Sequence, residues 1–217
     1  MLFEDGGQTV VVDTGPDFRQ QMLRAQVKRL DAVVFTHPHK DHLAGMDDIR
    51  SFNFRQRQPM AVYANELTIA ALKREFYYVF EAEKYPGVPS VDLHEIDEDR
   101  AFEAGGMQFQ PLPVMHYKMP VLGFRVGDVA YVTDANYIPP KTMGRLRGLK
   151  VLVLNALRKT KHLSHFNLEE ALALVAELQP ERAYFTHISH LMGTHAETEA
   201  LLPANIEIAT DGLVVEV

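Results

Sequence analysis

The chain of 217 residues has an ordinary globular composition, with 47% hydrophobic and 24% charged residues, which suits one domain or one domain with an insertion. Its formal net charge of -7 argues against a sequence-wide attraction to nucleic acid or to an anionic membrane. It contains no cysteine, which excludes disulfides, thiolate nucleophiles and cysteine-rich zinc sites.

Short apolar runs separated by turn residues predict a β-rich chain with helices between the strands. In the first half, strands are expected at 9–13, 31–37 and 60–64, and a helix at 16–26 with Pro16 in its first turn. Several runs are continuously apolar, which indicates strands buried on both faces. The pattern therefore predicts a mixed α/β fold.

Residues 65–100 differ in character from the rest of the chain. They contain a helical, aromatic stretch at 74–89 followed by an acidic one at 92–100. We expect this segment to be an insertion or a lid over a site. The alternative is a helix that packs its aromatic rings into the core.

The second half continues in the same style. Its expected strands are 107–114, 120–126, 129–134, 151–156, 182–187, 206–210 and 213–217. The sequences "VGDVAY" and "TDGLVV" indicate tight hairpin turns. The stretch "NLEEALALVAELQP" (167–180) predicts an amphipathic helix, with Asn167 as its N-cap and Pro180 just past its end.

A dense group of metal-binding side chains follows the strand expected at 31–37. The pattern is H-x-H-x-D-H, and imidazole nitrogen and carboxylate oxygen are the natural ligands of zinc, manganese and iron where no thiolate exists. In extended backbone His37 and His39 point to the same side. Asp41 and His42 lie at the expected start of a helix and point elsewhere. The spacing therefore predicts two adjacent ions, each bound by part of the cluster.

Three more candidate ligands share one arrangement, an apolar strand that ends in a histidine or an aspartate. "LPVMH" ends in His116, "AYVTD" in Asp134 and "AYFTH" in His187. In open α/β sheets the carboxyl ends of the strands carry the sites. We therefore expect these residues to complete the metal centre.

The order of these motifs resembles the metallo-β-lactamase superfamily of di-metal hydrolases, from "VVDTG" through the H-x-H-x-D-H cluster to the three single ligands. The resemblance covers nearly the whole chain and implies a single domain over 1–217, a four-layer αβ/βα sandwich with the metals at one edge. It implies these ligands: His37, His39 and His116 for one ion, Asp41, His42 and His187 for the other, and Asp134 as the bridge.

Within the superfamily the chain is most similar to the phosphodiesterase branch, such as the cyclic-phosphate phosphodiesterases of phosphonate breakdown, with ribonuclease Z more distant. The segments "DTGPDFRQQ", "HYKMPVLGFRVGD", "YVTDANYIP", "HLSHFNLEEALAL" and "FTHISH" carry this similarity. Relatives usually begin with one more strand, which is missing before "MLFEDGG". A preceding segment or a neighbouring chain of a homodimer would then cover the strand edge.

Two divalent ions would hold a bridging water, lower its pKa and make it a hydroxide nucleophile. We expect Asp41 to help orient this nucleophile and His165 to give a proton to the departing oxygen. The alternative for His165 is a helix-entry residue held by local hydrogen bonds. His162 and His190 are candidates for contact with the substrate or the ligands.

Asp13 is the last residue of the strand expected at 9–13. A metal-bound imidazole usually gives its other N–H to a carboxylate, and Asp13 is the expected partner. The alternative, which is compatible, is turn chemistry with Thr14, Gly15 and Pro16.

The expected substrate is a small phosphodiester, such as a cyclic phosphate or a nucleotide. A large nucleic acid is disfavoured, because residues 53–100 hold six Lys or Arg against nine Asp or Glu. The alternatives are a ribonuclease Z-like nuclease, a thioester hydrolase of the glyoxalase II kind, and a metal-binding module without turnover.

The absence of cysteine, the acidic N-terminus and the lack of any apolar run of about 18 residues predict a cytoplasmic protein without a membrane partner.

Overall fold

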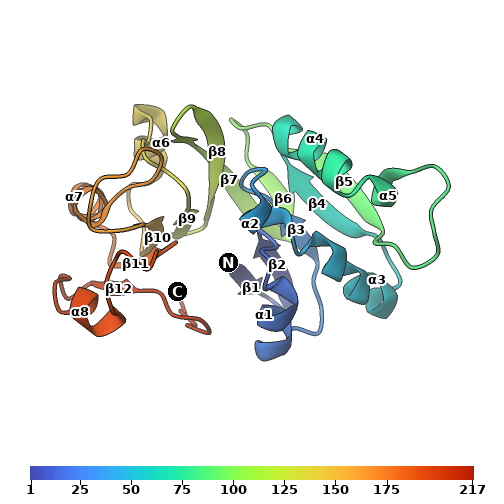
Figure 1. The fold of residues 1–217 in the computed structure, drawn as a ribbon, viewed down its shortest axis with the longest axis horizontal. Helices are drawn as coiled ribbons and strands as arrows, with labels where there is room; N and C mark the ends of the chain where they lie inside the picture. The colour runs from blue at the N-terminus through green and yellow to red at the C-terminus, as the bar shows by residue number, and fades with distance from the viewer. The chain divides into compact units, whose positions relative to one another are not determined.

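The computed structural model describes residues 1–217 and separates them into two units, Met1–Phe109 and Gln110–Val217. Each unit combines strands with helices (Figure 1), which confirms the predicted mixed α/β class. A single domain over the whole chain stays a prediction. No helix has the length and apolar character that a membrane crossing requires.

The first unit is built on a five-stranded sheet in the order β1-β2-β3-β4-β5. β1 is antiparallel to β2, and the other neighbours are parallel. The strands are β1 (Leu2–Asp5), β2 (Gln8–Val12), β3 (Ala32–Val34), β4 (Met60–Ala64), β5 (Val91–Glu95), β6 (Phe102–Ala104) and the first residues of β7 (Met107–His116). The helices are α1 (Phe18–Arg24), α2 (Lys40–Leu43), the 3-10 helix η1 (Met46–Ile49), α3 (Arg50–Gln56), α4 (Glu66–Glu75) and α5 (Tyr77–Phe80).

The helices of this unit pack against one face of its sheet (Figure 1). Val11, Val33 and Val62 lie opposite one another in the strand register, so their side chains share that face. Phe18 of α1 and Leu72 of α4 pack with them in one buried cluster. The burial of these side chains stabilises the carboxyl ends of β2 and β3. The candidate site residues Asp13 and His37 follow these two strand ends in the sequence.

The segment expected to be an insertion or a lid, 65–100, contains α4, α5 and β5. Phe76 is buried in the core of the first unit, as the alternative supposed, whereas Tyr77 and Tyr85 are exposed. The Tyr78 hydroxyl donates a 2.6 Å hydrogen bond to the Asp47 carboxylate. Burial first, and then this carboxylate, raise the pKa of Tyr78 to about 12. The lid role stays a prediction.

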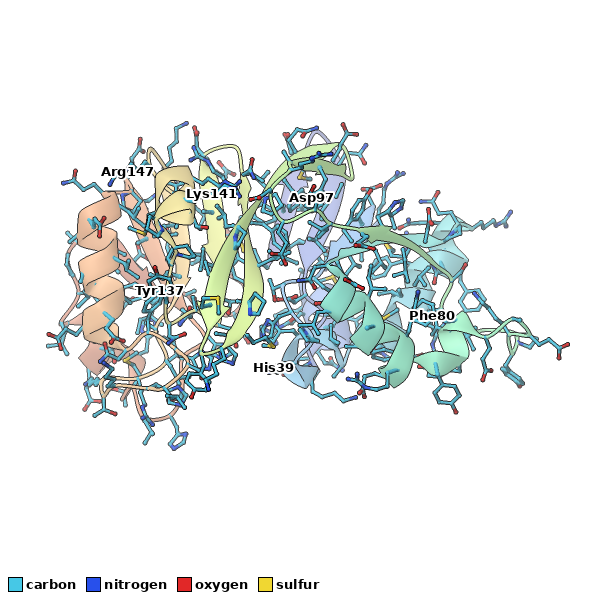
Figure 2. The ribbon with its side chains drawn as sticks, turned by 90° about the horizontal axis from the view of Figure 1, so that it is seen from above. His39, Phe80, Asp97, Tyr137, Lys141 and Arg147 are labelled. Carbon is cyan, nitrogen blue, oxygen red and sulfur yellow. The ribbon has the colours of Figure 1, made fainter.

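The second unit contains the sheet order β12-β11-β10-β9-β8-β7. Its central strands β9, β10 and β11 are parallel, and β7, β8 and β9 form antiparallel pairs. The elements after β7 are β8 (Met119–Val126), β9 (Val129–Val132), α6 (Pro140–Arg145), β10 (Val151–Asn155), α7 (Leu168–Leu178), β11 (Arg182–Thr186), α8 (His195–Glu199) and β12 (Ile206–Ile208). Lys141 and Arg147, near the two ends of α6, are labelled in Figure 2.

Helix α7 confirms the amphipathic helix predicted from the sequence. Asn167 and Glu170 form a reciprocal capping box, in which each side chain accepts from the other's backbone N–H. Ala171, Val175 and Leu178, spaced for one helix face, are buried in the core of the second unit. The cap residue Asn167 lies two residues after His165, and the helix begins at the next residue, Leu168.

Three parts of the strand prediction are wrong. Residues 213–217 form no strand, and "TDGLVV" makes a turn closed by the Leu213 N–H on the Thr210 carbonyl but no hairpin. The physical reason is that this apolar run, with Val214 83% exposed, pairs with no strand. Strands β1, β5 and β6 were not expected, because they are short or polar and depend on their neighbours for pairing. The helix expected in 74–89 ends at Phe80.

Candidate metal centre

The first set of candidate ligands lies in the first unit, after β3 and at the start of α2. His37 is buried, and its Nδ1 lies 2.9 Å from the Thr36 hydroxyl, so Nε2 is the ring atom that faces the other ligands. His37 Nε2 is 3.1 Å from His39 Nδ1. His39 directly precedes α2 and is exposed (Figure 2). The sequence prediction that these two rings reach one point agrees with this geometry.

Asp13 organises this set from the end of β2. Its carboxylate lies 2.7 Å from His42 Nδ1 and accepts hydrogen bonds from the backbone N–H and the hydroxyl of Thr36. The bond to Nδ1 leaves His42 Nε2 as the ligand atom, and Nε2 lies 3.5 Å from an Asp41 carboxylate oxygen. This is the contact expected of Asp13 from the sequence, and its role towards a metal stays a prediction.

A close backbone approach fixes the turn after Asp13. The Gly45 N–H donates to the Thr14 carbonyl at 2.8 Å. A Cβ atom on Gly45 would lie 2.3 Å from the Gly15 carbonyl oxygen, so only glycine fits there. The turn of "VVDTG" and the residues after α2 are thus held together, which sets where Asp13 and His42 meet.

The second set of candidate ligands lies in the second unit, at the ends of three strands. His116 is the last residue of β7, and its Nδ1 donates to the Ser164 carbonyl at 2.9 Å, which presents Nε2 as the ligand atom. Asp134 follows β9 and His187 follows β11, and their side chains approach to 3.4 Å between Oδ1 and Nδ1. The Thr133 hydroxyl also donates to Asp134.

Asn155 supports this set of candidate ligands and was not identified from the sequence. It ends β10, is fully buried, and clamps Ala135 through two hydrogen bonds. Its Oδ1 accepts from the Ala135 N–H at 2.8 Å, and its Nδ2 donates to the Ala135 carbonyl at 3.0 Å. Ala135 directly follows Asp134, which has a left-handed backbone with a φ of 57°. The signal was in the sequence: "VLVLN" is another apolar strand that ends in a polar residue.

His165 is packed among the other histidines of the second unit. Its ring centroid is 4.6 Å from that of His116, 4.9 Å from that of His187 and 5.1 Å from that of His162. It is 8% exposed, and its Nδ1 is buried without a hydrogen-bond partner. Burial lowers the pKa of His165 to about 4, with Asp134 opposing the shift and the three histidines adding to it. The ring is therefore neutral near pH 7.

The other two histidines named from the sequence have different surroundings. His162 is half-buried, with Nδ1 3.3 Å from the backbone N–H of Ser164, and burial, then the charge of Arg158, lower its pKa. His190 is exposed in the connection after β11. Their predicted contacts with substrate stay predictions.

The spacing of the ligand atoms tests whether these residues fit a metal. Two ligands that each lie about 2.1 Å from a tetrahedral ion are separated by about 3.4 Å. The three donor pairs described above are 3.1, 3.5 and 3.4 Å apart. In the second unit, ligand atoms of His116, Asp134 and His165 also lie within 4.8 Å of one another. Within each unit the donor chemistry and spacing therefore fit a divalent ion held by nitrogen and oxygen.

The family follows from comparison with known proteins. The sequence model of the family described as "Beta-lactamase superfamily domain" matches residues 8–188. The chain therefore belongs to the beta-lactamase superfamily. The predicted fold is confirmed, and the branch is confirmed by a solved structure described as a new diphosphatase from the PhnP family. That structure is 40% identical, covers 98% of this chain and 80% of its own, and has a TM-score of 0.90. The predicted class, a metal-dependent hydrolase, agrees with this family.

Other relatives carry different names. An octanoyltransferase of Porphyromonas gingivalis (strain ATCC BAA-308 / W83) is 34% identical over 98% of this chain, and a ribonuclease Z of Mycobacterium sp. (strain KMS) is 28% identical over 73% of it. The chain spans only 43% and 62% of the lengths of these relatives. Human tRNase Z, short form, has a TM-score of 0.77 at 17% identity over 99% of this chain and 90% of its own, which shows a shared fold.

Proposed function

We propose that this protein cleaves a phosphodiester bond in a small molecule with the help of two divalent ions. The observation that carries the proposal is the spacing of the donor pairs, which suits metal ions, in a chain of this superfamily. Diphosphatases and ribonucleases both cleave bonds between phosphorus and oxygen, and relatives of both names resemble this chain.

The proposed ligands are those expected from the sequence. They are His37, His39 and His116 for one ion, Asp41, His42 and His187 for the other, and Asp134 for both. When bound, such ions lower the pKa of a water molecule and neutralise charge on the phosphoryl oxygens. A ligand set made only of nitrogen and oxygen atoms suits zinc, manganese or iron.

His165 is the proposed catalytic residue that touches the substrate. The sequence suggested a proton donor, but burial keeps this ring neutral near pH 7. A neutral imidazole still carries one N–H, and we propose that it donates this N–H as a hydrogen bond to the departing oxygen. Asp41 is exposed, and as a metal ligand it would help to orient the attacking water.

The proposed substrate is small because the chain offers no large basic platform. Residues 53–100 hold six Lys or Arg against nine Asp or Glu, an unfavourable balance for a polyanion. The cytoplasmic location and the homodimer remain predictions from the sequence.

Thioester hydrolysis is the second candidate. By its name, the relative octanoyltransferase transfers an acyl group. A di-metal site that polarises a phosphoryl oxygen can also polarise a carbonyl oxygen. The chain spans less than half of that relative, so the name alone does not assign acyl chemistry to it.

Hydrolysis of bis(p-nitrophenyl) phosphate tests the proposal. Protein loaded with zinc or manganese should release p-nitrophenol, and chelation should abolish the activity. His165→Ala should lower kcat by about 100-fold or more, since one positioned acid–base or hydrogen-bonding group contributes about that much. His195→Ala is the matched control, because this histidine is exposed on α8.

Each other outcome has a defined meaning. Turnover of an octanoyl or lactoyl thioester without any phosphodiester turnover would favour the second candidate. Metal binding without turnover of either substrate would favour a binding module.

A further inference from the structure

Three exposed apolar side chains in the second unit lie on the same connections as proposed site residues. Tyr117 follows His116 directly, Tyr137 lies three residues after Asp134, and Leu163 lies between His162 and His165. They are 47%, 53% and 66% exposed. Tyr137 is labelled on its connection in Figure 2. Where exposed large apolar side chains gather into one patch near a proposed site, they are candidates for contact with its ligand.

Asn136 ties these three connections together. Its Oδ1 accepts from the Tyr117 N–H at 2.7 Å, and its Nδ2 donates to the Leu163 carbonyl at 3.1 Å. Its backbone N–H donates to the Met115 carbonyl at 2.9 Å, and Met115 in turn donates to the Tyr137 carbonyl at 2.9 Å. The three apolar residues are therefore presented on a backbone cross-linked by one side chain. Such pre-ordering lowers the entropic cost of binding a ligand.

Positive charge lies beside Tyr117 and in the connection that carries Leu163. The Lys118 ammonium lies 5.3 Å from the centroid of the Tyr117 ring. Arg158, Lys159 and Lys161 precede Leu163 in its connection, and the Arg158 side chain is bonded to the carbonyls of Thr160 and Lys161. Flat aromatic rings beside cations suit a ligand that joins an aromatic ring to a phosphate.

We propose that Tyr117, Tyr137 and Leu163 bind the nucleoside part of the substrate. The inference rests on the proposed phosphodiesterase function and narrows its substrate to a nucleoside phosphodiester. The tyrosine rings stack on the base, Leu163 covers the sugar or the base edge, and Lys118 faces the phosphate. These residues belong to the second unit, whereas the aromatic run of α5 belongs to the first unit, where the Tyr78 hydroxyl donates to the Asp47 carboxylate.

The test compares two substrates with the same leaving group. These are thymidine 5′-(p-nitrophenyl phosphate) and methyl p-nitrophenyl phosphate, with zinc- or manganese-loaded protein. For the thymidine substrate, Tyr117→Ala and Tyr137→Ala should each raise KM about fivefold or more, since base stacking on an aromatic ring contributes at least that much, and kcat should stay within about twofold. For the methyl substrate neither parameter should change. Tyr137→Phe should restore the low KM, because it keeps the ring.

Leu163→Ala has a matched control in Leu201→Ala, since Leu201 is 60% exposed in the same unit and lies outside the proposed surface. A direct readout is calorimetric titration with thymidine 5′-monophosphate and with methyl phosphate: only binding of the nucleotide should weaken in the tyrosine variants. Equal changes for both substrates, or none for either, would overturn the inference while leaving the proposed function intact. Failure of the wild-type protein to turn over both substrates would instead refute the proposed function.

Discussion

Replacing Asn155 with leucine should weaken both the fold and metal binding through Asp134. Asn155 is fully buried and forms two hydrogen bonds with the backbone of Ala135, the residue that follows Asp134. Leucine has nearly the same size, so the substitution changes hydrogen bonding far more than packing. The clamp on the left-handed turn at Asp134 would be lost.

The expected magnitude follows from burial. Ala135 is itself fully buried, so its N–H would be left without the Asn155 amide, whereas its carbonyl would keep the hydrogen bond that it accepts from the Phe166 N–H at 2.8 Å. One buried N–H without a partner costs about 1–3 kcal/mol and the second lost hydrogen bond about 0.5–1.5 kcal/mol, which gives a loss of about 1.5–4.5 kcal/mol in the free energy of unfolding. Loss of a residue that orients a metal ligand typically weakens metal affinity by about 10–100-fold.

Two measurements separate these effects. Urea unfolding of the metal-free protein gives the stability change, and competition with a chelator gives zinc affinity under native conditions. Asn53→Leu is the matched control, because Asn53 also clamps backbone, with bonds to Gln58 and Ser90, but neither partner adjoins a candidate ligand. It should lose stability and keep its zinc affinity. If Asn155→Leu lost stability and bound zinc as tightly as the wild type, Asn155 would have no part in positioning Asp134.

Three further predictions concern the first unit, and one of them takes its control from the second unit. Asp13→Asn should weaken zinc binding about 10–100-fold, because an amide holds the His42 ring less firmly than the carboxylate at 2.7 Å; an unchanged affinity in chelator competition would contradict this role. Gly45→Ala should lower the free energy of unfolding by about 1–3 kcal/mol, because its Cβ would meet a backbone oxygen at 2.3 Å. Gly144→Ala, in open space within a helix, should raise it by up to about 1 kcal/mol, and equal urea midpoints for the two variants would refute the reasoning. Tyr78 has a folded pKa of about 12 against an unfolded value of 10.0, so its contribution to stability is present below pH 10 and is lost as the pH rises towards 12. Tyr78→Phe should therefore show a shallower loss of stability over that range in urea titrations, and an unchanged slope would show that the hydroxyl does not contribute.

Several strands could be predicted because they are short apolar runs, and in β3 and β10 every residue is buried. β4 matches its prediction at 60–64, and β10, whose residues are all buried, differs from its prediction by one residue. A continuous apolar run bounded by polar residues has few other stable arrangements. A histidine or an aspartate at the end of such a run then marks a candidate ligand, which is how Asp134 and His187 were identified. Helix α7 could be predicted equally well, since its N-cap residue and the spacing of its apolar residues indicate the same helix.

Local patterns could not predict elements or contacts that depend on distant partners. β1 and β6 form only because β2 and β7 pair with them, and residues 213–217 have strand-forming residues but no such partner. The Ser164 carbonyl that orients His116 lies 48 residues away along the chain, and Asn155 lies 20 residues from Ala135. A single sequence contains no direct signal for such pairs.

Backbone conformation supplies an independent argument that the strand-end residues serve a function. Asp13, Asp134 and His187 each follow a strand closely, and each has a positive φ, of 64°, 57° and 58°. A left-handed backbone at a residue with a side chain costs about 1–3 kcal/mol, which glycine would avoid. Glycine in these places would favour the fold but remove a carboxylate or an imidazole. The proposed metal role would explain why these three positions keep a carboxylate or an imidazole in a conformation that penalises a side chain, although Gln26, Arg57, Tyr117 and Gln179 adopt it as well.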